Sequence, residues 1–199
     1  AVCFIIGLKF LSSPETARRG NALSALGMAI AVVVTLWDNE VLTYEWIIIG
    51  LALGTFIGIP VALLVEMTAM PEMVALLNGS GGLASFLLGW SSYHSDASIS
   101  SFDAFTIFLS VLIGGIACSG SVVAWGKLKG VKWIPEGQCQ FKGQNIFNAA
   151  ILILITVLGV MLCVMPGATS SYAIFIVIMI LALILGVMSV LPIGGADMP

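Results

Sequence analysis

Charged side chains are scarce in this sequence: Asp, Glu, Lys and Arg make up 9% of its 199 residues, whereas 60% of the residues are hydrophobic. Soluble domains carry about 25% charged residues, so a water-soluble fold of this length could not cover its surface with so few. Apolar runs of about 17 residues or more, long enough to cross a bilayer as helices, recur along the chain. The composition therefore predicts an all-α polytopic membrane protein and excludes a soluble globular domain.

The sequence also lacks the patterns that mark soluble enzymes and metal proteins. It has no GxGxxG after a strand, no GxxxxGK[ST], no HExxH and no serine-centred elbow. Its four cysteines form no CxxC pair, which argues against a disulfide framework or a metal site. No polar segment is long enough to hold a nucleotide-binding domain. We therefore expect no catalytic residue, no cofactor-binding residue, no metal ligand and no nucleic-acid partner within this chain.

The apolar runs divide the chain into a bundle of about six full transmembrane helices plus one truncated N-terminal helix. The truncated span covers residues 1–11. The full spans are expected at 21–37, 46–64, 73–92, 104–126, 145–165 and 172–193. The sequence begins inside an apolar run and ends abruptly at GGADMP. We expect a single transmembrane domain over residues 1–199 that is a fragment of a larger protein.

The basic residues predict which loops share one side of the membrane. Every Lys and Arg lies in or beside one of two polar segments between the apolar runs. Lys9, Arg18 and Arg19 belong to the first, and Lys127, Lys129, Lys132 and Lys142 belong to the second. Four spans separate these segments, an even number, so both fall on one side, and the positive-inside rule makes it the cytoplasmic or matrix side. The loops 12–20, 66–72 and 127–144 are expected there, and the loops 38–45, 93–103 and 166–171 opposite.

No span interior contains Asp, Glu, Lys, Arg or His, and the single histidine, His94, is expected to be a solvated residue of an outer loop. The prominent polar residue within a span is Asn78. At helical spacing it shares a stripe with Gly81, Gly82, Ser85 and Gly89. An amide without a partner in hydrocarbon costs several kcal/mol, so Asn78 must face another helix or water. An interhelical hydrogen bond and a polar path for water or protons both satisfy this need, and spacing alone favours the bond.

Two further patterns have structural explanations. Glu72 stands in the first turn of the fourth span, where the helix dipole favours a carboxylate. Helix capping and a role in proton uptake are about equally compatible with that position. Gly50, Gly54 and Gly58 form two overlapping GxxxG spacings, which typically let another helix approach closely. We expect these glycines to serve helix packing.

Four stretches together resemble one known family. They are LSSPETARRGNALSALGMAIAV (11–32), VEMTAMPEMVALLNGSGGLAS (65–85), GSVVAWGKLKG (120–130) and GGADMP (194–199). In matching order, and nearly end to end, these stretches resemble the membrane domain of proton-translocating NAD(P) transhydrogenase, in the part found in the bacterial beta subunit.

The resemblance implies a function that the chain alone does not carry out. The family couples hydride transfer from NADH to NADP⁺ with proton movement across a bacterial or mitochondrial inner membrane. Separate soluble domains bind NAD(H) and NADP(H), and neither domain is in this chain. The expected partners are those two domains, the lipid bilayer and, because family members work as dimers of complete units, a second copy.

The resemblance also assigns roles to particular residues. Asn78 and Ser121 match the family's proton path, Glu72 matches its acidic position after MP, and Asp197 matches the aspartate that meets the NADP(H) domain. Some members have histidine where this chain has Asn78. An amide has no suitable pKa, so Asn78 cannot carry the proton itself. The resemblance therefore implies a path-lining residue that forms hydrogen bonds.

A different class of function stays open at this point. A helical secondary transporter, or a scaffolding membrane bundle without hydride chemistry, would share the same composition. The similarity between AMPE (69–72) and ADMP (196–199) is the kind of internal repeat that transporters often contain. It is only four residues long, so it indicates little.

Overall fold

The computed structural model describes residues 2–37, 44–95, 99–135, 137–165 and 171–195. Within these ranges the chain is helical and contains no strand. The elements are α1 (Val2–Leu11), α2 (Ala17–Trp37), α3 (Tyr44–Leu64), the 3₁₀ turn η1 (Met67–Ala69), α4 (Met70–Ser95), α5 (Ser101–Leu128), α6 (Gln144–Val164) and α7 (Ser171–Val190). Six helices are long and apolar enough to cross a membrane, and α1 is shorter. The expected fold class is confirmed.

Two helix ends differ from the expected spans for reasons that involve proline. α4 begins at Met70 rather than at 73, because Pro71 is tolerated in a first turn, where its missing N–H has no helical partner to lose. α7 ends at Val190 rather than at 193, because Pro192 lacks the N–H that a further turn would need. The chain after α7 closes with a bond from the Ile193 N–H to the Val190 carbonyl.

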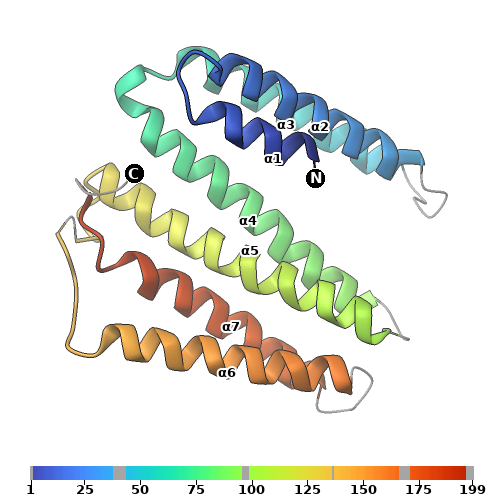
Figure 1. Cartoon of the computed structure of the whole chain (residues 1–199), viewed down its shortest axis with the longest axis vertical. Coiled ribbons are helices and arrows are strands. Elements are labelled where there is room, and N and C mark those ends of the chain that lie inside the picture. Colours follow the sequence, from blue (N-terminus) through green and yellow to red (C-terminus); the bar gives the residue numbers. More distant parts are fainter. Residues whose placement is uncertain (1, 38–43, 96–98, 136, 166–170, 196–199) are drawn as a thin grey trace. The chain divides into compact units, whose positions relative to one another are not determined.

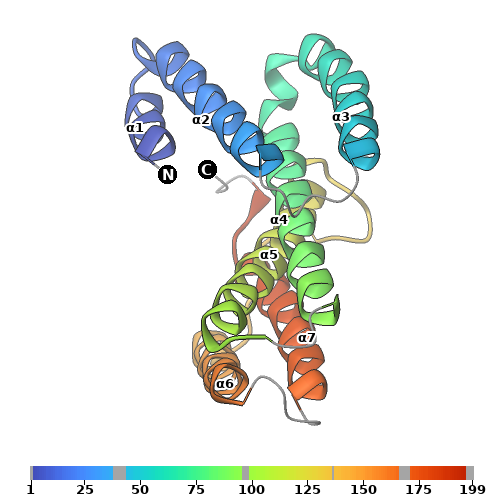
Figure 2. The same cartoon turned by 90° about the vertical axis from the view of Figure 1, so that its right-hand side faces the viewer.

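The helices form two compact units, residues 1–64 and 65–199. In the first unit, α1 packs against α2, as Figure 1 and Figure 2 both show. A Cβ atom on Gly20 would lie 2.7 Å from the Gly7 carbonyl oxygen, so only glycine permits this approach. The Thr16 hydroxyl donates to the Phe10 carbonyl at 2.6 Å and closes the turn between the two helices.

The third helix of that unit packs against neither α1 nor α2, and none of its residues is buried. Cβ atoms added at Gly50, Gly54 or Gly58 would meet no atom within 4 Å. The close helix contact expected at these glycines therefore has no partner inside the first unit. It stays a prediction about a helix from elsewhere.

The second unit is an antiparallel bundle in which α4 packs on α5, α5 on α7, and α6 on both α5 and α7 (Figure 1). Large apolar side chains from all four helices form its core: Phe86, Phe108, Val111, Ile155, Phe175 and Ile178. Because successive helices alternate in direction, one end of the bundle gathers η1, the connection 129–143 and the chain after α7. We call this end the inner end.

Glycines set the distance between α4 and α5. The buried face of α4 consists of Gly79, Gly82, Phe86, Gly89 and Tyr93. A Cβ on Gly82 would lie 2.6 Å from the Cys118 backbone nitrogen, so the two backbones touch here. Gly81, which the sequence stripe placed on the same face as Asn78, is exposed and has open space beside it. The contact face is thus rotated toward Gly79.

This pair of neighbouring glycines gives a matched test of the α4–α5 contact. Gly82→Ala must push the backbones apart, and overpacking of this kind costs about 1–3 kcal/mol of unfolding free energy. Gly81→Ala adds the same methyl group to open space and is expected to change stability little. Denaturant unfolding of both variants in detergent measures the difference. Equal stability of the two variants would show that Gly82 does not set the helix separation.

Candidate functional site

The structure brings together two of the residues that the sequence singled out. The Asn78 side chain on α4 donates through Nδ2 to Ser121 Oγ on α5, at 2.8 Å. Ser121 is 7% exposed, whereas Asn78 is at the exposed edge of the helix pair. Gly79 permits this approach, because its Cβ would lie 3.0 Å from Ser121 Cβ. The pair therefore belongs to the tight α4–α5 contact and is held in place by it.

The remaining hydrogen-bonding capacity of the pair is free for water. Within the described residues, the Asn78 amide makes no other hydrogen bond, which leaves one N–H and the carbonyl oxygen. The Ser121 hydroxyl can accept from Asn78 and donate its own hydrogen onward. A donor and an acceptor side by side are what a chain of hydrogen-bonded waters needs at each step.

A partly open cavity of about 270 Å³ extends along α4 and α5 from the inner end of the bundle to this pair. Its walls are formed by three helices and the chain after α7: Pro71, Val74, Ala75, Asn78, Ser121, Ala124, Leu128, Val190 and Ile193. Pro71, Leu128 and Ile193 stand at the inner ends of their elements, whereas Asn78 and Ser121 lie deeper. The cavity has room for several waters, and the pair supplies polar partners at its deep end.

Glu72 is not among the residues that line this cavity. It lies half-exposed in the first turn of α4, about 9 Å along the helix axis from Asn78. Its place at a helix N-terminus fits the dipole argument. Its part in proton uptake stays a prediction.

Asp197 lies outside the described residues, and its assigned role also stays a prediction. The described residues end with Gly194 and Gly195, the two glycines that open the GGADMP motif. They follow directly on Ile193, which lines the cavity.

From the sequence, Lys127 is expected to be one of the charges of a basic loop, and its role in the structure is not foreseen. The structure places Lys127 in the last turn of α5, where it is 3% exposed. Its ammonium group donates to the carbonyl oxygens of Gly137, Leu191 and Ile193. A signal was present in the sequence: Gly120, Val123 and Lys127 follow helical spacing on one face, and all three are buried.

Two amides of α6 were also overlooked. Gln144 is 1% exposed, and its Nε2 donates to the Met188 carbonyl at 2.8 Å. Asn148, one turn later on the same face, donates to the same carbonyl at 3.3 Å. Its Oδ1 atom is buried without a partner among the described residues. These amides fix α6 against α7 near the inner end, as Lys127 fixes α5 against the end of α7.

At the opposite end of the bundle, His94 is exposed, but it belongs to the last turn of α4 rather than to a loop. Its ring lies 6.2 Å from that of Trp90 and 5.9 Å from that of Tyr172, centroid to centroid. Neighbouring Tyr93 is buried and stacks on Phe175 at 4.2 Å. These rings close the outer end of the bundle, away from the Asn78–Ser121 pair.

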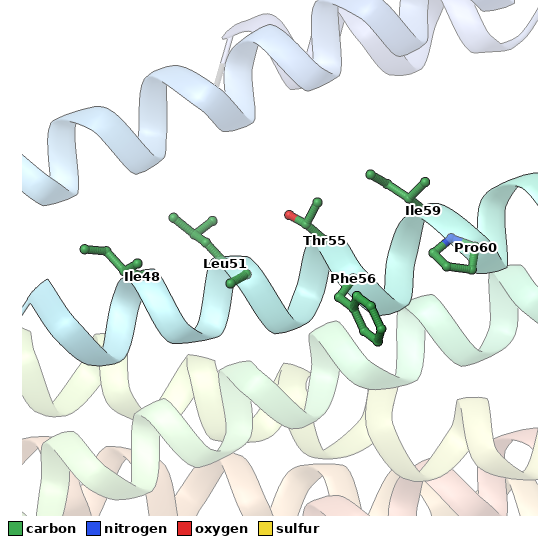
Figure 3. A pocket seen from close by; sticks show the side chains of 7 residues that line it. Ile48, Leu51, Thr55, Phe56, Ile59 and Pro60 are labelled. Atoms are coloured by element: carbon green, nitrogen blue, oxygen red, sulfur yellow. The ribbon is translucent and has the colours of Figure 1, made fainter.

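A shallow groove lies along the exposed surface of α3 and is lined by that helix alone. Figure 3 shows Ile48, Leu51, Thr55 and Ile59 along one side of the helix, with Phe56 and Pro60 beside them. Thr55 supplies the one side-chain hydroxyl, and no lining group can titrate. This groove suits an apolar neighbour, whereas the cavity at Asn78 and Ser121 is formed by several helices and contains polar groups, so the Asn78–Ser121 cavity is the candidate functional site. Across the described residues, no three His, Cys, Asp or Glu side chains gather as a metal site would require.

Comparison with known proteins gives the same assignment as the motifs. A family model described as NAD(P) transhydrogenase beta subunit matches residues 1–199. Two curated sequences from Rhodospirillum rubrum, one of them from a specified strain, are named NAD(P) transhydrogenase subunit beta. Each is 38% identical over 206 aligned residues that cover 100% of this chain. The chain spans 43% of the length of these relatives. It belongs to the NAD(P) transhydrogenase beta subunit family.

Proposed function

We propose that this chain forms the proton path of a proton-translocating NAD(P) transhydrogenase, and that the complete enzyme transfers hydride from NADH to NADP⁺. The observation that carries this proposal is the hydrogen-bonded Asn78–Ser121 pair at the deep end of the cavity from the inner end. Family membership supplies the hydride chemistry. NAD(H) and NADP(H) are cofactors of nucleotide-binding domains outside this chain.

The pair acts on protons through water. Neither an amide nor a serine hydroxyl titrates at accessible pH, so the pair lines the path rather than stores the proton. Its donors and acceptors orient waters in the cavity, and these waters relay the proton along hydrogen bonds. The group that binds and releases the proton belongs to another part of the complete enzyme.

The basic inner end of the bundle faces the cytoplasm or matrix in this proposal, because Lys129, Lys132 and Lys142 are there and positive residues are retained on that side. Cys139 is a natural reporter, since it is exposed in the connection between α5 and α6. A membrane-impermeant thiol reagent should label Cys139 in sealed vesicles whose cytoplasmic face points outward. Labelling only in vesicles of the opposite orientation would reverse the assignment.

The proposed partners attach at different surfaces. The NADP(H)-binding domain meets the inner end, where Gly194 and Gly195 begin the motif that contains Asp197, and the NAD(H)-binding domain belongs to the same complex. Lipid covers the exposed apolar side chains of the spans, such as Leu83 and Leu88 on α4. A second complete unit forms a homodimer.

The test uses the complete enzyme in sealed vesicles with a pH indicator. Hydride transfer between the two nucleotides should move protons across the membrane, and an uncoupler should abolish the gradient and change the transfer rate. Hydride transfer without proton movement would contradict the proposed role of this chain. Movement of protons or a solute that is independent of both nucleotides would favour a secondary transporter instead.

A further inference from the structure

The chain that leaves α7 is held by Lys127 of α5. The Lys127 ammonium donates to the Leu191 carbonyl at 2.6 Å and to the Ile193 carbonyl at 2.7 Å. Its third N–H donates to the Gly137 carbonyl at 3.1 Å, in the connection between α5 and α6. An ammonium group has three donors, and here three neutral carbonyls from two segments use all of them.

Burying the Lys127 ammonium costs free energy, so we expect a lysine at this buried position to have a role that an exposed lysine would not fulfil. Burying a cation away from water requires partners for the whole charge. The carbonyls supply these partners, and the negative ends of the α5 and α7 dipoles, which meet at the inner end, add to them. An exposed lysine at the end of α5 would serve the positive-inside rule equally well, as Lys129 does.

The three acceptors belong to a connected group of bonds. The Leu191 carbonyl also accepts from the Cys139 backbone N–H, at 3.1 Å. Lys127 therefore links α5, the connection 129–143 and the end of α7 through one charged group. Because all three bonds start from a single nitrogen, a shift of α5 against α7 strains them together.

The same residues form part of the wall of the Asn78–Ser121 cavity. Ile193, whose carbonyl Lys127 holds, lines the cavity together with Val190 and Leu128. Ser121 and Lys127 lie on one continuous helix, about 9 Å apart along its axis. Directly beyond Ile193 follow Gly194 and Gly195, and then the stretch that contains Asp197.

We propose that Lys127 is a positioning residue for the proton path, because it holds residues 191–193 against α5, an inference that rests on the proposed function. Its bonds hold the chain after α7 where Val190 and Ile193 form the cavity wall beside the polar pair. Lys127 thereby ties residues 191–193 and α5 into one wall of the cavity. Without Lys127, residues 191–193 are no longer held at the cavity wall, and hydride transfer continues with less proton movement.

The test compares Lys127→Met with Lys129→Met in the complete enzyme in vesicles. Methionine keeps the length of the side chain but removes its donors, and Lys129 is an exposed lysine whose Nζ lies 5.3 Å from the Trp125 ring centroid. In Lys127→Met the number of protons moved per hydride transferred should fall to about half or less. Hydrogen exchange at the Cys139 amide should rise by about tenfold, because its acceptor is no longer held. Lys129→Met should keep both values.

A purely structural role would lower the amount of folded enzyme but leave the ratio of protons to hydride unchanged. Lys127→Arg covers the case in which the methionine variant does not assemble. Arginine keeps the charge, but its planar fork cannot direct donors to three carbonyls in two segments. We expect this variant to assemble with a lowered ratio. A wild-type ratio in every assembled Lys127 variant overturns the proposal.

The outcomes separate this inference from the proposed function. If wild-type enzyme moves no protons during hydride transfer, the proposed function fails and the inference fails with it. If wild-type enzyme is coupled and the Lys127 variants match it, the inference alone fails.

Discussion

Asn78→Leu should block proton coupling while the bundle stays folded. Leucine is close to asparagine in size, but it removes the donor to Ser121 and the two remaining groups that face the cavity. The substitution places an apolar side chain at the deep end of the cavity, where waters then have one polar partner fewer. We expect the protons moved per hydride to fall by about tenfold or more, a loss on the scale of a buried group left without its hydrogen bond.

The stability of the same variant distinguishes a path from a structural hydrogen bond. A single hydrogen bond between membrane helices contributes about 0.6 kcal/mol on average, so loss of the Asn78–Ser121 bond alone should affect folding little. Asn78→His serves as the matched variant, because imidazole keeps a donor and an acceptor at the same place. The histidine variant should retain more coupling than the leucine variant. Proton movement by Asn78→Leu at the wild-type ratio would end the path hypothesis and leave an interhelical bond.

The sequence predicted most of the bundle because the apolar runs are long and their breaks are polar. The cost of an unpaired amide in hydrocarbon predicted that Asn78 must face another helix or water, and the resemblance indicated Ser121 as part of the same path. The structure adds the hydrogen bond that joins them and the cavity that reaches them. Neither can be read from spacing, because both depend on how closely α4 and α5 approach.

The rotation of α4 was harder to predict. Three glycines, Gly79, Gly81 and Gly82, lie within four consecutive positions, and small residues at several angles leave the contact face ambiguous. The structure resolves the ambiguity through the partner helix, since Gly82 meets the Gly114 carbonyl and Gly79 meets Ser121. A sequence contains the residues of both faces, but their pairing is a property of the packed helices.

The burial of Lys127 could not be predicted from the sequence for a different reason. Composition treats a lysine at the end of a span as a solvated charge, and that rule holds for exposed Lys129. Lys127 departs from it because the chain after α7 returns to α5 and offers carbonyls that no sequence pattern marks. Backbone acceptors have the same chemistry at every residue, so only the fold shows which of them meet a side chain.

Filling the cavity should also cause a large loss of proton coupling, and its walls can be changed without altering Asn78 or Ser121. Ala124 lies one turn from Ser121 toward the inner end and lines the cavity. Ala124→Phe should fill the space between the inner end and the pair, and waters should no longer connect the inner end with Ser121 and Asn78. We expect proton movement per hydride to drop by about tenfold or more, since a proton crosses an apolar plug far less readily than a chain of waters.

Val122→Phe is the matched control for this change, because Val122 is on the same helix, is 48% exposed and does not line the cavity. Both variants add a ring to α5, so a general disturbance of the helix would lower coupling in both. Loss of coupling in Ala124→Phe alone would place the water path in this cavity. Wild-type coupling in Ala124→Phe would mean that protons do not pass through this cavity. The proton path would then reach Asn78 and Ser121 by another route or would not include them.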